Sequence, residues 1–193
     1  MNKALRANLL LLLTAMIWGV AFVAQDVAMD AMEPFTFNAA RTLVAALVLL
    51  PCIRLLDALE RKRRGASAIR APLTFTTMTP AQKRTLLIGG ICCGIALFFG
   101  TSLQQFGIRE TSAGKAGFVT ALYIVLVPIS GLLFKRSVRR NVWLAVGLCL
   151  IGLFLLCVTE TFTASIGDLY LLLCAVAFTA HILIIDHFSP KTV

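Results

Sequence analysis

Residues 8–28 read NLLLLLTAMIWGVAFVAQDVA, an apolar stretch whose one charged residue, Asp26, lies near its end. A helix needs about 20 mostly apolar residues to cross the hydrocarbon core of a bilayer. Lys3 and Arg6 precede the stretch, as in a signal peptide. It is too long for the apolar region of a signal peptide, however, and it lacks a small-residue cleavage site before Gln25. The stretch therefore predicts a transmembrane helix that the protein keeps.

Five similar stretches follow, and together they predict an all-α, polytopic membrane protein with six transmembrane helices. The six cover residues 8–28, 35–56, 86–106, 113–134, 142–159 and 168–185. The chain has 193 residues, of which 59% are hydrophobic and 14% charged, whereas soluble domains carry roughly 25% charged residues. In lipid the backbone must bond to itself, and the stretches lack the alternation of a membrane barrel, so helices are expected.

The charged residues predict the orientation of these helices. Fifteen of the 18 basic residues lie at the N-terminus, from the end of the second stretch to the start of the third, between the fourth and fifth, or in the tail. They are Lys3, Arg6, Arg54, Arg61, Lys62, Arg63, Arg64, Arg70, Lys83, Arg84, Lys135, Arg136, Arg139, Arg140 and Lys191. The other side carries Arg109 with the acids Asp26, Asp30, Glu33, Glu110, Glu160 and Asp168. Because short basic loops stay in the cytoplasm, both termini are expected on the cytoplasmic side of the inner membrane.

This distribution explains the net charge of +9 without nucleic acid, so no nucleic-acid partner is expected. The basic run at 60–64 is expected also to touch anionic lipid headgroups. The six cysteines have neither zinc-site spacing nor the context of secreted disulfides, and they are interpreted as packing residues. No phosphate-binding Gly-Lys-Ser/Thr loop is present, so neither a cofactor, a metal nor direct use of ATP is expected.

The first and sixth stretches align without gaps at an offset of 160 residues. Residues 8–26 lie over 168–186, with a bulky aromatic at Trp18 and Phe178 and an aspartate at each end point, Asp26 and Asp186. Five crossings separate the two starts, so the second copy enters the membrane from the opposite side, as in the inverted repeats of secondary transporters. Residues 1–160 are thus expected to form one five-helix unit with a cytoplasmic loop at about 57–84. Residues 161–193 are expected to begin a truncated second unit; a complete six-helix protein is the alternative.

An ordered set of motifs resembles the EamA-type unit of the drug/metabolite transporter superfamily. The motifs are Trp18-Gly19, the Pro34…Arg41 start of the second stretch, Glu110-Thr-Ser-Ala-Gly, the run Leu-Tyr-Ile-Val-Leu-Val-Pro128, and Gly147…Gly152. The resemblance implies a ten-helix carrier built from two inverted units. The chain departs from it at Lys135-Arg136, where such units often carry a glutamate.

Two basic residues lie inside apolar stretches, where an ionisable group costs about 2.5–3.5 kcal/mol on insertion scales and is by default a functional hypothesis. Arg41 lies near the start of the second stretch and is expected in the bundle interior, where its guanidinium could hold a substrate carboxylate. Pairing with a carbonyl, Asp26 or Glu33 is the alternative. Lys115 opens the fourth stretch, and it could equally extend to the outer interface.

Further candidates for the wall of a substrate cavity follow from helical spacing. Trp18, Phe22 and Gln25 share one face of the first helix, although aromatics at this spacing more often serve packing. Tyr123 follows Lys115 by two turns on the same side of its helix. Gln104, with Thr101 and Gln105, forms a polar end of the third helix that could line a vestibule or bond to adjacent helices.

The remaining expectations concern proton transfer, bending and helix packing. His181 could relay protons, although a lone histidine more often packs with one hydrogen bond. Pro128 removes a helical hydrogen bond and Gly131 leaves room beside it, which predicts a hinge. The pairs Gly90/Gly94 and Ala113/Gly117 predict close helix interfaces.

The function expected from these features is a secondary transporter, with export as the expected direction, that moves small metabolites or drug-like molecules by alternating access. A membrane enzyme of lipid or isoprenoid chemistry is an alternative, but the paired Asp and His-Glu-x-x-His motifs of metal sites are missing. A structural or regulatory membrane subunit is the third alternative. The partners expected are a small-molecule substrate and membrane lipid, and a homodimer is left open.

Overall fold

The computed structural model describes residues 3–64, 78–134, 137–157 and 165–191, and this part of the chain is entirely helical outside its turns. The segments are α1 (Lys3–Met29), α2 (Pro34–Arg64), α3 (Pro80–Arg109), α4 (Ala113–Ala121), α5 (Tyr123–Leu133), α6 (Arg140–Cys157) and α7 (Ile166–Phe188), followed by the 3₁₀ turn η1 (Ser189–Lys191). The prediction of an all-α, polytopic helical membrane protein is confirmed.

Among the described residues, five helical stretches are long and apolar enough to cross a membrane. They are Leu5–Met29, Pro34–Leu56, Pro80–Arg109, Ala113–Leu133 and Ile166–Phe188, and a shorter apolar helix covers Arg140–Gly152. Each corresponds to one of the six predicted stretches. The most apolar windows of the first two contain no buried residue. Their leucine and valine side chains therefore face outward, as lipid-facing residues do.

The second span ends at Leu56, as expected, but helical structure extends from both sides into the connection that follows it. The predicted loop covered residues 57–84, but α2 continues to Arg64 and α3 already begins at Pro80. Residues 54–64 are mostly good helix formers and prolong α2 beyond its apolar part. At the start of α3, Thr79 and Gln82 form a capping box, and a proline at the first helical position favours an early start. The basic side chains at 61–64 lie outside the described part.

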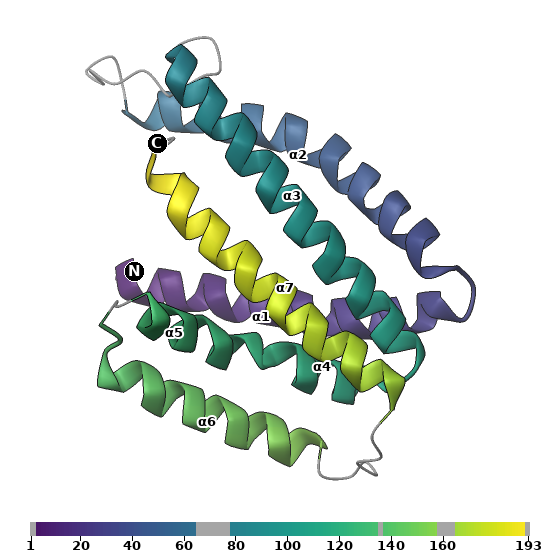
Figure 1. Cartoon of the computed structure of the whole chain (residues 1–193). Helices are drawn as coiled ribbons and strands as arrows, with labels where there is room; N and C mark the ends of the chain where they lie inside the picture. The colour runs from purple at the N-terminus through teal and green to yellow at the C-terminus, as the bar shows by residue number, and fades with distance from the viewer. Residues whose placement is uncertain (1–2, 65–77, 135–136, 158–164, 192–193) are drawn as a thin grey trace.

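The centre of the bundle is the contact between α3 and α7 (Figure 1). Helix α7 also packs on α4 and α5, while α1 and α2 contact α3, and α6 lies at an edge against α4 and α5. The buried apolar cluster joins four helices through Met29, Ile108, Ala116, Val119 and Leu171. The last helix in the sequence is thus an interior element of the bundle.

Glycine allows the close approach of α3 and α7, but at positions other than those predicted. A Cβ atom at Gly107 would lie 2.5 Å from Cγ of Leu171, a side chain with no exposed area. Nothing lies within 4 Å of a Cβ placed at Gly90, Gly94 or Gly117. The prediction that these three residues form close interfaces is therefore wrong within the described chain.

The fourth span is interrupted at Leu122, which separates α4 from α5. The Leu122 amide bonds to the Val119 carbonyl at 3.2 Å, three residues back, as in a 3₁₀ turn. Pro128, the predicted hinge, is buried six residues further on and lies within the continuous helix α5. The interruption thus lies N-terminal to the proline, and a hinge function of Pro128 stays a prediction.

Candidate functional site

The polar side chains of the bundle gather at one end, where α1 and α3 end and where α2, α4 and α7 begin (Figure 1). Three contacts bring these helix ends together. Arg109 of α3 reaches Glu33 in the α1–α2 turn, Lys115 of α4 reaches Asp168 of α7, and Gly167 of α7 lies against the Gly107 carbonyl. This end is opposite to the basic connections of the chain.

The first polar group is a cluster of one arginine and three amides, Gln25, Asn38, Arg41 and Gln105, here called the amide–arginine cluster. Arg41 donates from Nη1 to Gln25 Oε1 at 2.7 Å and from Nη2 to Asn38 Oδ1 at 2.8 Å. Gln105 donates to the same Gln25 oxygen, and Gln25 Nε2 donates to the Ala21 carbonyl at 3.0 Å. The cluster links α1, α2 and α3.

Local helix geometry positions the arginine. Arg41 lies about two turns into α2, and Asn38, three residues earlier, is on the same face of that helix. The guanidinium carbon also lies 5.4 Å from the ring centre of Phe37, within the range of a cation–π contact. Gln25, Asn38 and Gln105 are buried and Arg41 is half-buried. The guanidinium is therefore held at the edge of the packed interior.

The chemistry of the guanidinium determines how the three amides are oriented. An arginine only donates hydrogen bonds, so Gln25 and Asn38 must turn their oxygens toward Arg41. Gln105 must then turn its NH₂ group toward the Gln25 oxygen. Two buried groups are left without a hydrogen-bond partner: Nδ2 of Asn38, a donor, and Oε1 of Gln105, an acceptor. Such orphaned groups are costly unless a water or a ligand satisfies them.

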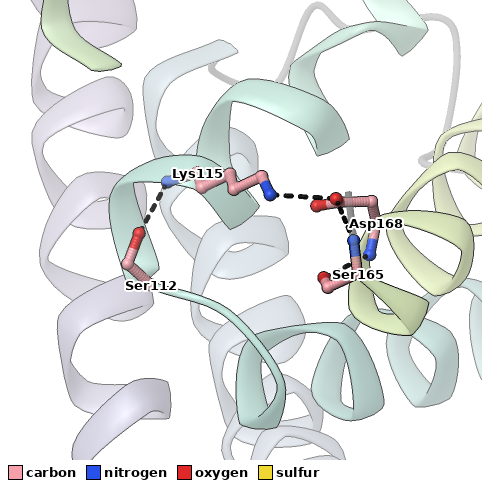
Figure 2. Close-up of polar contacts among 4 residues, drawn as sticks. All are labelled: Ser112, Lys115, Ser165 and Asp168. Atoms are coloured by element: carbon pink, nitrogen blue, oxygen red, sulfur yellow. Dashed lines mark hydrogen bonds and ion pairs between the residues drawn. The ribbon is translucent and has the colours of Figure 1, made fainter. Parts of the chain in front are cut away.

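The second polar group joins the first turns of α4 and α7 (Figure 2). Lys115 Nζ lies 2.9 Å from Asp168 Oδ2, and the two side chains are 9% and 20% exposed. The same Asp168 oxygen accepts from the backbone N–H of Ser165 at 2.8 Å, within the capping box that starts α7. Ser112 caps α4 in turn, accepting from the Lys115 amide at 3.2 Å. The ion pair and both helix caps thus form one continuous polar contact.

An exposed ion pair lies at the same end. Arg109 Nη1 lies 2.8 Å from Glu33 Oε2, with side chains 45% and 70% exposed. Solvent screens such a pair, so it contributes little to stability. Arg109 is nevertheless a useful comparison for Arg41. It lies at the same end of the bundle, but its charge is neutralised by a carboxylate.

The other candidate residues lie apart from these contacts. Trp18 is 55% exposed on α1, while Phe22 packs against the apolar core. Tyr123 is half-buried, with its ring edge-on to Phe178 at 6.3 Å. Gln104 is buried on α3 next to the cluster member Gln105. His181 places Nδ1 3.1 Å from the Cys93 carbonyl, a packing contact between α7 and α3.

The structure thus brings together two of the predicted cavity residues, Gln25 and Arg41. The role of each predicted cavity residue, and of His181 in proton transfer, stays a prediction. Sequence reasoning missed Asn38, although its spacing of three from Arg41 was a usable signal. It also missed Asp168 as the partner of Lys115, because the two lie 53 residues apart in the chain. No group of three or more potential metal ligands occurs among the described residues.

The sequence of the chain matches one protein family and one named relative. Residues 5–158 match the model of a family described as EamA-like transporter family. An "Uncharacterized transporter" of Archaeoglobus fulgidus is 34% identical over 188 residues, which is 97% of this chain and 51% of that protein. The chain therefore spans about half the length of this relative. No solved structure matches.

Proposed function

Because the chain belongs to the EamA-like transporter family, we propose that it is part of a secondary carrier that moves small metabolites or drug-like molecules across the cytoplasmic membrane by alternating access, with export as the direction. The family and the name of the relative point to a transporter rather than to an enzyme. The chain itself is a multi-pass membrane protein.

The observation that supports the proposal is the amide–arginine cluster at one end of the bundle. A charged side chain within spans is costly, and proteins keep such residues mainly on substrate and ion pathways. Arg41 meets neutral amide oxygens from two helices, and two buried polar groups of the cluster have no partner. A ligand bound on a transport pathway would supply partners for these two groups.

Alternating access needs elements that can move relative to each other. The fourth span has a local 3₁₀ turn at Leu122, between α4 and α5, and we propose that this turn is where the span bends. The Lys115–Asp168 pair connects α4 to α7. We therefore place the moving part of the carrier in α4, α5 and α7.

The orientation proposed has both termini in the cytoplasm and the amide–arginine cluster toward the outer face. It rests on the basic connections, which are retained on the cytoplasmic side of bacterial-type membranes.

The test is flux into and out of proteoliposomes that contain the protein expressed from its whole reading frame. Vesicles are loaded with a mixture of labelled carboxylates, neutral polyols and organic cations, and efflux is followed with and without imposed ion gradients. Saturable efflux of at least one solute, absent from protein-free vesicles, is expected. Efflux equal to that of protein-free vesicles for every class would overturn the proposal.

A further inference from the structure

We propose that the amide–arginine cluster binds the carboxylate of a small organic anion that carries a hydrogen-bond donor beside the carboxylate. The inference rests on the proposed carrier function and names the substrate class of that site. It depends on three features of the cluster: its charge, its unused donors and its orphaned amide groups.

The charge of the cluster has no counter-charge in the described chain. Arg109 and Lys115, at the same end of the bundle, contact the carboxylates of Glu33 and Asp168. Arg41 contacts only neutral amide oxygens and the Phe37 ring. A cation taken out of water is stabilised most by an anion with good hydrogen-bond geometry. The site therefore favours an anion and disfavours a cation.

The unused donors of the cluster match a carboxylate. A guanidinium has five N–H donors in a planar fork, and Arg41 uses one on Gln25 and one on Asn38. Carboxylates bind such forks through two oxygens, which adds specificity to the charge attraction. The orphaned Nδ2 of Asn38 is a further donor from the residue one turn earlier on the same helix face.

The orphaned acceptor adds a second requirement. Oε1 of Gln105 is fully buried and accepts no hydrogen bond, and the orientation forced by Arg41 prevents an amide flip from resolving this. It can be satisfied only by a donor. A ligand with a hydroxyl next to its carboxylate supplies acceptors for Arg41 and Asn38 and a donor for Gln105. A carboxylate without the hydroxyl supplies no donor for Gln105, which then depends on a water molecule.

The experiment measures binding of four small probes to the protein purified in detergent from its whole reading frame. The probes are lactate, propionate, 1,2-propanediol and tetramethylammonium, titrated at constant ionic strength in a calorimeter. Lactate has the carboxylate and the donor, propionate has the carboxylate only, propanediol has hydroxyls without charge, and tetramethylammonium has the opposite charge. We expect lactate to bind most tightly, propionate several-fold more weakly, and the other two without saturation.

Three variants test the assignment. Arg41→Gln should weaken lactate binding at least about tenfold, the effect of losing one charge-assisted hydrogen bond. Asn38→Asp should also weaken lactate binding, because it places a carboxylate against the guanidinium. This variant retains Arg41, and we expect it to fold even if Arg41→Gln does not. Arg109→Gln is the matched control, because it removes an arginine from the same end of the bundle, and lactate binding should not change.

Three results would overturn the inference. Lactate and 1,2-propanediol could bind equally well, Arg41→Gln and Arg109→Gln could weaken lactate binding equally, or the folded protein could bind none of the probes. The flux assay separates these results from the carrier function. Transport of neutral or cationic solutes without anion binding would remove the subsite and keep the carrier. Lactate binding that depends on Arg41, without flux of any solute, would remove the carrier and keep the subsite.

Discussion

Lys115 and Asp168 join the first turn of α4 to the first turn of α7 through a contact of 2.9 Å between Nζ and Oδ2, and both side chains are largely buried. Removing one member of a buried pair leaves an uncompensated charge, which typically costs roughly 3–5 kcal/mol. Lys115→Met should therefore lower the free energy of unfolding in detergent by several kcal/mol, as measured by denaturant titration. Lys115→Met combined with Asp168→Asn should recover much of that loss, because no charge is stranded. Additive losses in the double variant would contradict the pairing.

The exposed pair Arg109–Glu33 should behave differently. Glu33→Gln is expected to change the free energy of unfolding by less than about 1 kcal/mol, because solvent and salt screen this contact. The measurement is the same titration, repeated at low and high salt. A loss as large as that of Lys115→Met would show that the exposed pair is more important than its geometry indicates.

The close approach of α3 and α7 at Gly107 can be tested by adding one methyl group. Gly107→Ala places a methyl group 2.5 Å from Leu171 Cγ, and Leu171 has no exposed area into which to move, so a loss of about 1–3 kcal/mol is expected. Gly94→Ala, on the same helix with nothing within 4 Å, is the matched control and should be neutral or slightly stabilising. Thermal unfolding in detergent distinguishes them, and equal midpoints would argue against this interface.

The capping box of α7 can be tested by hydrogen exchange. Ser165 accepts from the Asp168 amide at 3.4 Å, while the Asp168 side chain accepts from the Ser165 amide at 2.8 Å. Ser165→Ala should cost about 1 kcal/mol and speed amide exchange in the first turn of α7. Thr79→Ala, which removes the equivalent cap of α3, should affect the start of α3 and leave α7 unchanged. Faster exchange at both helix starts in both variants would contradict local capping.

The proposed orientation can be tested with single cysteines in a protein whose six native cysteines are replaced by alanine. Glu110→Cys lies in the exposed α3–α4 turn and Ser137→Cys lies between α5 and α6. In intact cells, a membrane-impermeant maleimide should label the first and reach the second only after permeabilisation. The reverse pattern would invert the topology and, with it, the placing of the amide–arginine cluster toward the outer face.

Much of the fold could be predicted from the sequence, because span length and apolar content are local properties. The extension of α2 to Arg64 was missed because the helix was expected to end with its apolar stretch, whereas the good helix formers after it continue the helix. The interruption at Leu122 could not be predicted, since neither proline nor glycine marks the turn. The small-residue pairs Gly90/Gly94 and Ala113/Gly117 indicated the wrong positions, because spacing does not say which helix face meets a neighbour.

The sequence indicated several members of the candidate site, Gln25, Arg41, Gln105 and Lys115, but not how they are paired. Arg41 and Lys115 stand out because ionisable groups within apolar stretches are rare. Their partners depend on how each helix is rotated about its axis in the bundle, and the sequence alone does not give that rotation. The bond from Arg41 to Gln25 spans 16 residues and the one from Gln105 to Gln25 spans 80, so both emerge only from the packed bundle.

The central place of α7 has a consequence for how such a protein is assembled. During synthesis the segments before α7 enter the membrane first, and until α7 arrives Ile108 and Ala116 lack the neighbour that closes their cluster with Leu171. Packing of α7 therefore closes the core of the described bundle only after α1, α3 and α4 have been made.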